Sequence, residues 1–221
     1  MPLIPSTYTV QDVLTAIKRQ FGDESGAQLT DTDIIRWINE GQLEIARKNK
    51  YSRTSVTTPS VSSQANYNLA GVNILSIESV FYGDYPITGE TYEQVQESYL
   101  KSYSTTSFPA TSTNVPLVWY EYGDSIYFWP PPTVAGDIIK LLVCTYPTKL
   151  TSAVDSLSIP DTYYQALLDF IMSKAYEMDD DPQASMAKYN RHTDTINELA
   201  SASKAVNNHS YPTITILPED L

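Results

Sequence analysis

Apolar residues near the amino terminus recur every three or four positions, a spacing that places them on one face of a helix. The members of this first set are Val10, Val13, Leu14, Ile17 and Phe21. Thr9, with Asp12 three residues later, has the pattern of an amino-terminal helix cap, and Gly22 suits a carboxyl-terminal end. The sequence therefore predicts a helix between Thr9 and Gly22.

A second apolar stripe follows a polar loop, and Thr30 with Asp33 repeats the capping pattern. Its members are Ile34, Trp37, Ile38, Gly41 and Ile45. They occupy about a third of the helix circumference at 3.6 residues per turn. A glycine in mid-helix costs up to about 1 kcal/mol relative to alanine, so we expect Gly41 to permit a close helix crossing.

The opposite side of this second helix carries Leu43 among charges of both signs. A single exposed leucine is common on protein surfaces, but charged neighbours of both signs favour a contact with another subunit. The candidate subunit-contact residues are Arg36, Glu40, Leu43 and Arg47.

The pattern changes after residue 50 to Val, Ile, Thr, Tyr and Trp punctuated by Gly and Pro, which favours strands. Residues 115–122 and 125–129 predict a hairpin that turns at Gly123-Asp124. Residues 73–81 predict another strand, and residues 137–146 predict a central strand buried on both faces. Residues 91–101 have the spacing of a short helix.

Helical spacing returns after residue 159, where Pro160 suits a first helical turn. Asp181 and Pro182 begin a further helix with a thinner apolar face. The members of that thin face are Met186, Tyr189, Thr193, Ile196 and Ala200. After residue 205 the helical signals fade.

These patterns predict an α+β fold made of an antiparallel helical bundle, an inserted antiparallel β lobe and an extended carboxyl-terminal tail. Residues 1–50 and 159–204 would form the bundle, because helices from both ends need each other to bury their apolar stripes. Residues 51–158 would form the lobe, and residues 205–221 the arm. The predicted bundle core consists of Ile34, Trp37, Ile38, Ile45, Leu167, Leu168 and Ile171.

The predicted arm alternates apolar and polar residues and belongs to no helix. An extended apolar segment can add a strand to the sheet edge of a partner. We therefore expect the arm to dock on a partner or on the chain's own lobe. The candidate contact residues are Tyr211, Ile214, Ile216 and Leu217.

The net charge of −12 and the pI near 4.4 disfavour sequence-specific binding to nucleic acid, since phosphate contacts need Lys or Arg. Such acidity serves solubility, or it lines a passage through which nucleic acid moves without sticking. No apolar run is long enough to span a bilayer. The one cysteine, Cys144, excludes an internal disulfide.

Candidate catalytic chemistry is sparse, so we expect no enzyme, no cofactor and no metal site. His192 and His209 are distant from Cys144 in the sequence, and no Gly-rich phosphate loop is present. Asp179, Asp180 and Asp181 are better explained by helix capping than by cation binding. The 17 tyrosines favour sheet packing and protein interfaces over a sugar platform.

Three motifs, taken in order, resemble those of the head-to-tail adaptor (connector or head-completion) proteins of tailed bacteriophages. The first is Ile35-Arg36-Trp37-Ile38-Asn39-Glu40-Gly41-Gln42. The second runs from Trp119 to the prolines at 130–132, and the third runs from Ile159-Pro160-Asp161 into Tyr164-Gln165-Ala166-Leu167-Leu168. The resemblance covers most of residues 8–200.

The resemblance implies a structural virion protein made in the bacterial host cytoplasm and located at the head–tail junction. It implies a dodecameric ring that joins the portal above to a tail or nozzle protein below, with DNA passing through without specific binding. It also implies that the arm, including Ile214 and Leu217, grips the portal. The alternatives are a tail-tube or neck protein lower in the tail and a glycan-binding virion module.

Overall fold

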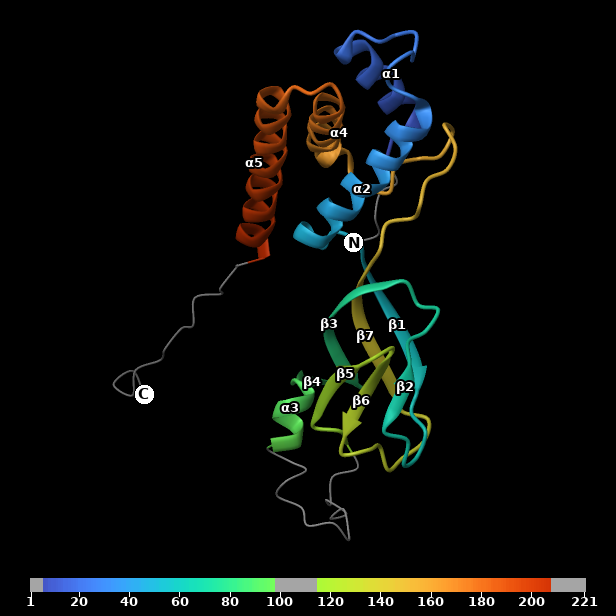
Figure 1. Cartoon of the computed structure of the whole chain (residues 1–221). Coiled ribbons are helices and arrows are strands. Elements are labelled where there is room, and N and C mark those ends of the chain that lie inside the picture. Colours follow the sequence, from blue (N-terminus) through green and yellow to red (C-terminus); the bar gives the residue numbers. More distant parts are fainter. Residues whose placement is uncertain (1–5, 98–114, 208–221) are drawn as a thin grey trace, which may run out of the picture. The chain divides into compact units, whose positions relative to one another are not determined.

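A computed structural model describes residues 6–97 and 115–207 of the 221-residue chain (Figure 1). The chain separates into two compact units. One comprises residues 1–49 and 147–221, and the other comprises residues 50–146. We call them the helical unit and the β unit and describe each by itself. The domain boundaries expected from the sequence remain a prediction.

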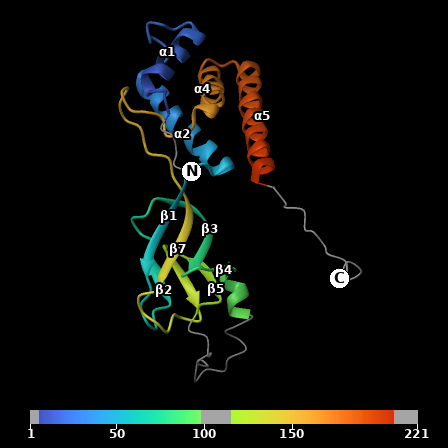
Figure 2. The ribbon, with the colours of Figure 1, turned by 180° about the vertical axis from the view of Figure 1, so that it is seen from behind.

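The helical unit contains α1 (Val10–Phe21), α2 (Asp31–Asn49), α4 (Tyr164–Met178) and α5 (Pro182–Asn207), with the short 3-10 helix η2 (Asp161–Tyr163) before α4. α4 is the central helix: it contacts α1, α2 and α5, and it lies between α2 and α5 in both views (Figures 1 and 2). Its sequence is therefore apolar on most sides, and residues 166–173 are all buried.

The caps explain where these helices begin. Thr9 and Asp12 form a reciprocal capping box at the start of α1, and Gly22 ends α1 with a positive φ of 84°. The Thr30 hydroxyl accepts a hydrogen bond from the Asp33 N–H at 3.2 Å, so it caps α2 in the same way.

The β unit is a curled seven-stranded sheet in the order β1-β7-β3-β4-β5-β6-β2. The strands are β1 (Arg53–Pro59), β2 (Asn66–Asn68), β3 (Ile74–Tyr82), β4 (Tyr85–Gly89), β5 (Val118–Tyr122), β6 (Ser125–Trp129) and β7 (Ile138–Thr145). The short helix α3 (Tyr92–Val95) follows β4. The buried core of this unit consists of Tyr67, Val80, Tyr82, Ile87, Ile126, Phe128, Ile139, Leu141 and Val143.

The predicted fold class is wrong in its specific form, although α+β itself is compatible with the structure. The described chain is a mixed α/β arrangement of five helices and one curled sheet, not an antiparallel bundle with an antiparallel lobe. β4 and β5 pair in parallel, while the other strand pairs are antiparallel. The long connection between β4 and β5 lets the chain return in the same direction, and strand periodicity carries no information about that.

The prediction of an extended arm over residues 205–221 is wrong at its start. α5 continues to Asn207, so residues 205–207 are helical where the sequence predicted an extended arm. Capping by Asp181, whose carboxylate accepts from the Ala184 N–H at 3.0 Å, sets the start of this helix. The rest of the arm, residues 208–221, lies outside the described residues.

The strand predictions fared unevenly. The hairpin that turns at Gly123-Asp124 is confirmed as β5 and β6. β7 is central, between β1 and β3, but the prediction of burial on both faces is wrong. Ile139 and Leu141 are buried while Ile138 is 57% exposed, because only one face of the curled sheet covers the core.

Candidate assembly surface

The candidate subunit-contact residues lie along one side of α2, at spacings of three and four. Arg36, Glu40 and Arg47 are exposed, and Leu43 is partly buried. Arg36 forms ion pairs within its own helix, to Asp33 at 3.3 Å and to Glu40 at 4.0 Å. Such exposed pairs contribute little to stability, so these charges are available to a partner at small cost.

Two shallow hollows continue this side of α2 across α4 and α5. The first, of about 340 Å³, is lined by Arg36, Trp37 and Glu40 of α2 and by Lys174, Glu177 and Met178 of α4. The second, of about 620 Å³, shares Lys174 and Glu177 and extends to Met186 and Tyr189 of α5. We call this continuous area the mixed surface.

The apolar part of the mixed surface includes Met186 and Tyr189, which the sequence placed on the thin apolar face of the last helix. Met186 is 67% exposed, and Met178 and Tyr189 are also exposed. Apolar side chains surrounded by charges of both signs are typical of an interface with a polar rim. In the sequence, the thin apolar face of the last helix was the signal for this exposure, because a thin apolar stripe leaves some of its members uncovered.

The helix beneath this surface is held by the predicted core residues. All seven are buried: Ile34, Trp37, Ile38, Ile45, Leu167, Leu168 and Ile171. At Gly41 a Cβ atom would stand 2.6 Å from the Leu167 Cδ1 and 2.9 Å from the Phe170 Cδ1. The absence of a side chain at Gly41 therefore allows α2 and α4 to approach this closely.

Polar residues of the same α2 segment fasten the loop that leads back from the β unit. The Asn39 amide donates to the Leu150 carbonyl at 2.9 Å and accepts from the Leu150 N–H at 2.8 Å. The Gln42 Oε1 accepts from the Ser158 N–H at 2.7 Å. Within the segment 35–42, the core residues, the close helix crossing and the loop anchors therefore all have structural roles.

A buried polar cluster joins α4 to α5 and was missed at the sequence level. The Asp169 carboxylate is almost fully buried and receives Lys188 Nζ at 3.2 Å and Arg191 Nε at 3.3 Å. His192 Nδ1 lies 2.8 Å from the Ala166 carbonyl oxygen, and its Nε2 lies 3.6 Å from the Glu44 carboxylate. Burial lowers the pKa of His192, so the ring is neutral at pH 7.

This geometry gives His192 a structural role. The ring is fully buried between helices, so no substrate can reach it. Cys144 is buried too, in the β unit, and burial raises the pKa of its thiol. Among the described residues, no group of three or more His, Cys, Asp or Glu is placed to hold a metal ion. His209 lies outside the described residues.

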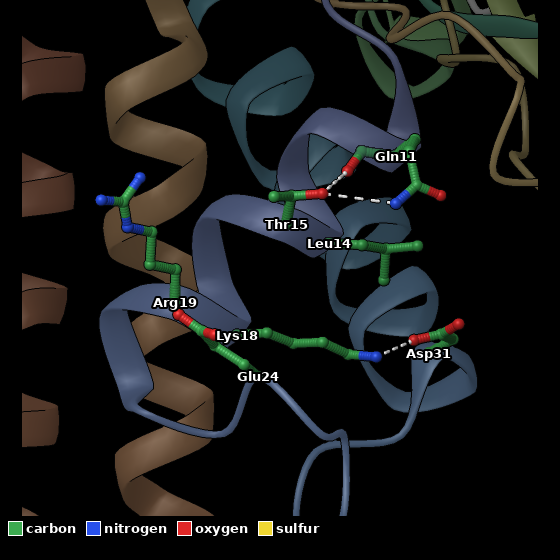
Figure 3. A pocket seen from close by; sticks show the side chains of 7 residues that line it. All are labelled: Gln11, Leu14, Thr15, Lys18, Arg19, Glu24 and Asp31. Atoms are coloured by element: carbon green, nitrogen blue, oxygen red, sulfur yellow. Dashed lines mark hydrogen bonds and ion pairs between the residues drawn. The ribbon is translucent and has the colours of Figure 1, made fainter.

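A further hollow, of about 460 Å³, lies where α1 meets the loop to α2 (Figure 3). Lys18 reaches across it to Asp31, and the Gln11 amide donates to the Thr15 hydroxyl at 3.3 Å. Arg19 extends away from Asp31. The lysine and the aspartate therefore already neutralise each other across this hollow.

The predicted arm contacts, Tyr211, Ile214, Ile216 and Leu217, lie outside the described residues. No described helix is both long and apolar enough to cross a membrane.

These features describe a structural protein with exposed surfaces suited to assembly and with a fully enclosed histidine and thiol. The family model for the SU10 adaptor protein matches residues 8–213, so the chain belongs to this family of phage adaptor proteins. It is therefore a bacteriophage structural adaptor and a virion component, and the family implies association with head and tail components. No curated protein matches the chain.

Proposed function

We propose that this protein forms a ring, most simply a dodecamer, that joins the capsid portal to the tail and continues the DNA channel. The observation that carries the proposal is the adaptor-family match over residues 8–213, which spans both units. The net charge of −12 agrees with a conduit that repels phosphate and lets DNA pass without specific binding.

In this proposal the mixed surface forms the contact between neighbouring subunits. Arg36 and Glu40 supply charges at its first hollow, Met186 with Tyr189 supplies its apolar part, and Leu43 and Arg47 continue the same side of α2. Each contact in a closed ring joins two different surfaces, so the mixed surface would face a different, complementary surface of the neighbouring subunit, and its charges of both signs would select that surface.

The arm provides the contact to the portal. Tyr211, Ile214, Ile216 and Leu217 are apolar or aromatic in a segment that carries two prolines, Pro212 and Pro218. Prolines favour an extended backbone, which is the conformation needed to add a strand to a sheet edge.

The decisive experiment is electron microscopy of particles assembled from portal-bearing heads and the purified protein. We expect a ring of twelve subunits directly on the portal, and no ring after deletion of residues 211–221 from a chain that still folds. Normal attachment of the truncated protein would show that the arm does not make the joint. A ring found lower, along the tail, would favour the alternative of a tail-tube or neck protein.

A charge reversal tests the subunit contact separately. Arg36→Glu should prevent ring closure, because Arg36 lines the first hollow, whereas the matched change Arg19→Glu on α1 should not, because Arg19 lies outside the mixed surface. Rings that form equally well with both variants would remove the mixed surface from the proposal. Tight DNA binding by the isolated protein at physiological salt would contradict the proposed conduit.

A further inference from the structure

One face of the β5–β6 hairpin carries tyrosines that do not take part in the core of the β unit. Tyr120 and Tyr127 are direct cross-strand partners, so their side chains project from the same face. Trp119 with Phe128 projects from the other face, where Phe128 is part of the buried core. Tyr120, Tyr122 and Tyr127 therefore lie on the outer face of the curled sheet.

These rings form one connected cluster with Tyr92 of α3. Tyr120 and Tyr127 stack with ring centroids 5.1 Å apart and planes inclined by 9°. Tyr92 lies 5.7 Å from Tyr120 and 5.2 Å from Tyr122, and Tyr122 stands edge-on to Tyr127 at 6.4 Å. We call Tyr92, Tyr120, Tyr122 and Tyr127 the tyrosine surface.

The tyrosine surface is both ordered and accessible. A reciprocal capping box between Thr91 and Gln94 fixes the start of α3 and with it Tyr92. Burial raises the pKa of Tyr120, which stays half-covered by its neighbours. Tyr122 is 61% exposed. A partner would meet aromatic rings that are already packed, so little side-chain entropy is lost on binding.

The described sequence around this surface carries negative charges only, and Lys101 lies outside the described residues. Residues 54–97 and 115–139 contain no Lys, Arg or His. Their acidic residues are Glu78, Asp84, Glu90, Glu93, Glu97, Glu121, Asp124 and Asp137. Glu93 directly follows Tyr92, and Asp124 lies two residues after Tyr122; both acids are exposed. The charged residues near the tyrosine rings are therefore acidic.

We propose that the tyrosine surface is a docking site for a lysine- or arginine-bearing segment of a partner polypeptide. The face of a tyrosine ring is electron-rich and attracts guanidinium and ammonium groups, and nearby carboxylates strengthen that attraction. Tyrosine is also enriched at protein interfaces. Charge complementarity selects a cationic partner over nucleic acid, which these carboxylates repel.

The test uses the full chain and a fluorescent peptide of alternating arginine and glycine, with a glutamate-for-arginine peptide of equal length as the negative probe. Tyr122→Ala should weaken binding of the arginine peptide by roughly 3- to 30-fold, the range expected for a lost cation–π contact. Tyr122→Phe should retain binding, because the ring and not the hydroxyl makes the contact.

The β unit offers a matched control for each change. Tyr85 is 69% exposed, and Asp84 sits in a Gly-Asp turn like that of Asp124. Asp84 precedes β4 and Tyr85 is its first residue, whereas Asp124 follows β5. Because β4 and β5 run parallel, the two turns lie at opposite ends of the strand pair. Tyr85→Ala should leave binding unchanged, and Asp124→Asn should weaken it more than Asp84→Asn.

Three results would overturn the proposal. Equal losses for Tyr122→Ala and Tyr85→Ala would show that the peptide responds only to the overall negative charge. Binding of neutral chitooligosaccharide, lost in Tyr122→Ala, with no binding of the arginine peptide would identify a glycan platform. Self-association of the free chain that Tyr122→Ala abolishes, again without peptide binding, would identify a second copy as the occupant.

Discussion

The close crossing of α2 and α4 makes a sharp prediction about Gly41. Replacing a mid-helix glycine with alanine ordinarily stabilises a helix by about 1 kcal/mol. Here the new Cβ would stand 2.6 Å from the Leu167 Cδ1 and 2.9 Å from the Phe170 Cδ1, and both of those side chains are buried. Overpacking of this kind costs about 1–3 kcal/mol. We therefore expect Gly41→Ala to lower the free energy of unfolding by about 1 kcal/mol.

The sign of this effect should reverse when the obstructing side chain is shortened. Leu167→Ala alone should cost about 2–5 kcal/mol, the range for a truncated core leucine. In that background the Leu167 Cδ1 atom is gone and the Phe170 ring can shift into the space that it leaves, so Gly41→Ala should recover about 1 kcal/mol of helix propensity and fill part of the cavity. The two substitutions should therefore couple by about 2 kcal/mol.

The measurement is guanidinium unfolding of the four proteins of this cycle, followed by far-ultraviolet circular dichroism. Ala187→Gly, at an exposed position of α5, gives the size of the helix-propensity effect without any packing change. If Gly41→Ala stabilises the wild-type background, or if the two substitutions are additive, Gly41 is not excluding Leu167 and the explanation of the crossing fails.

Three other changes follow from the described contacts. Ile38→Ala should lower the free energy of unfolding by about 2–5 kcal/mol in the same denaturation assay, because the side chain is fully buried. Backbone N–H groups of Leu29, Gln28 and Ala27 lower the pKa of Asp23 to about 2. This carboxylate therefore stabilises the fold above pH 3.8, and thermal unfolding should show the stabilisation fading between about pH 4 and 2 in wild type but not in Asp23→Asn. Burial raises the pKa of Cys144, so Ellman's reagent should react with it slowly in the native protein and rapidly after unfolding.

Local structure was largely predictable from the sequence because it depends on neighbours in the chain. The capping pairs and apolar stripes placed α1 and α2, and the turn residues placed the β5–β6 hairpin. Gly41 was predicted to mark a close helix crossing, since a glycine in mid-helix needs a compensating reason.

Longer-range features were not predictable, because pairing and exposure depend on what else the fold brings near. The parallel β4–β5 pair contradicts the antiparallel lobe, and no residue of either strand encodes its direction. Met186 and Tyr189 share a helical face with Ile196, which is fully buried, yet both are exposed, because helical spacing does not reveal which members of a stripe a neighbouring helix covers. The tyrosine surface required the strand register, because composition alone cannot bring separate tyrosines onto one face.

The two proposed contacts should differ in their response to salt because the two units use their charges differently. In the helical unit most described basic side chains near the mixed surface already have acidic partners, such as Lys174 with Glu177 and Lys188 with Asp169. A subunit contact there would gain mainly from apolar burial, which rising salt does not weaken. The tyrosine surface lies among residues 54–97 and 115–139, which contain acidic but no basic residues, so its attraction for a cationic segment is screened over about 8 Å at physiological ionic strength. Raising the salt concentration should therefore release the cationic partner while the ring stays closed, and a ring that opened first would show that its contacts are chiefly electrostatic.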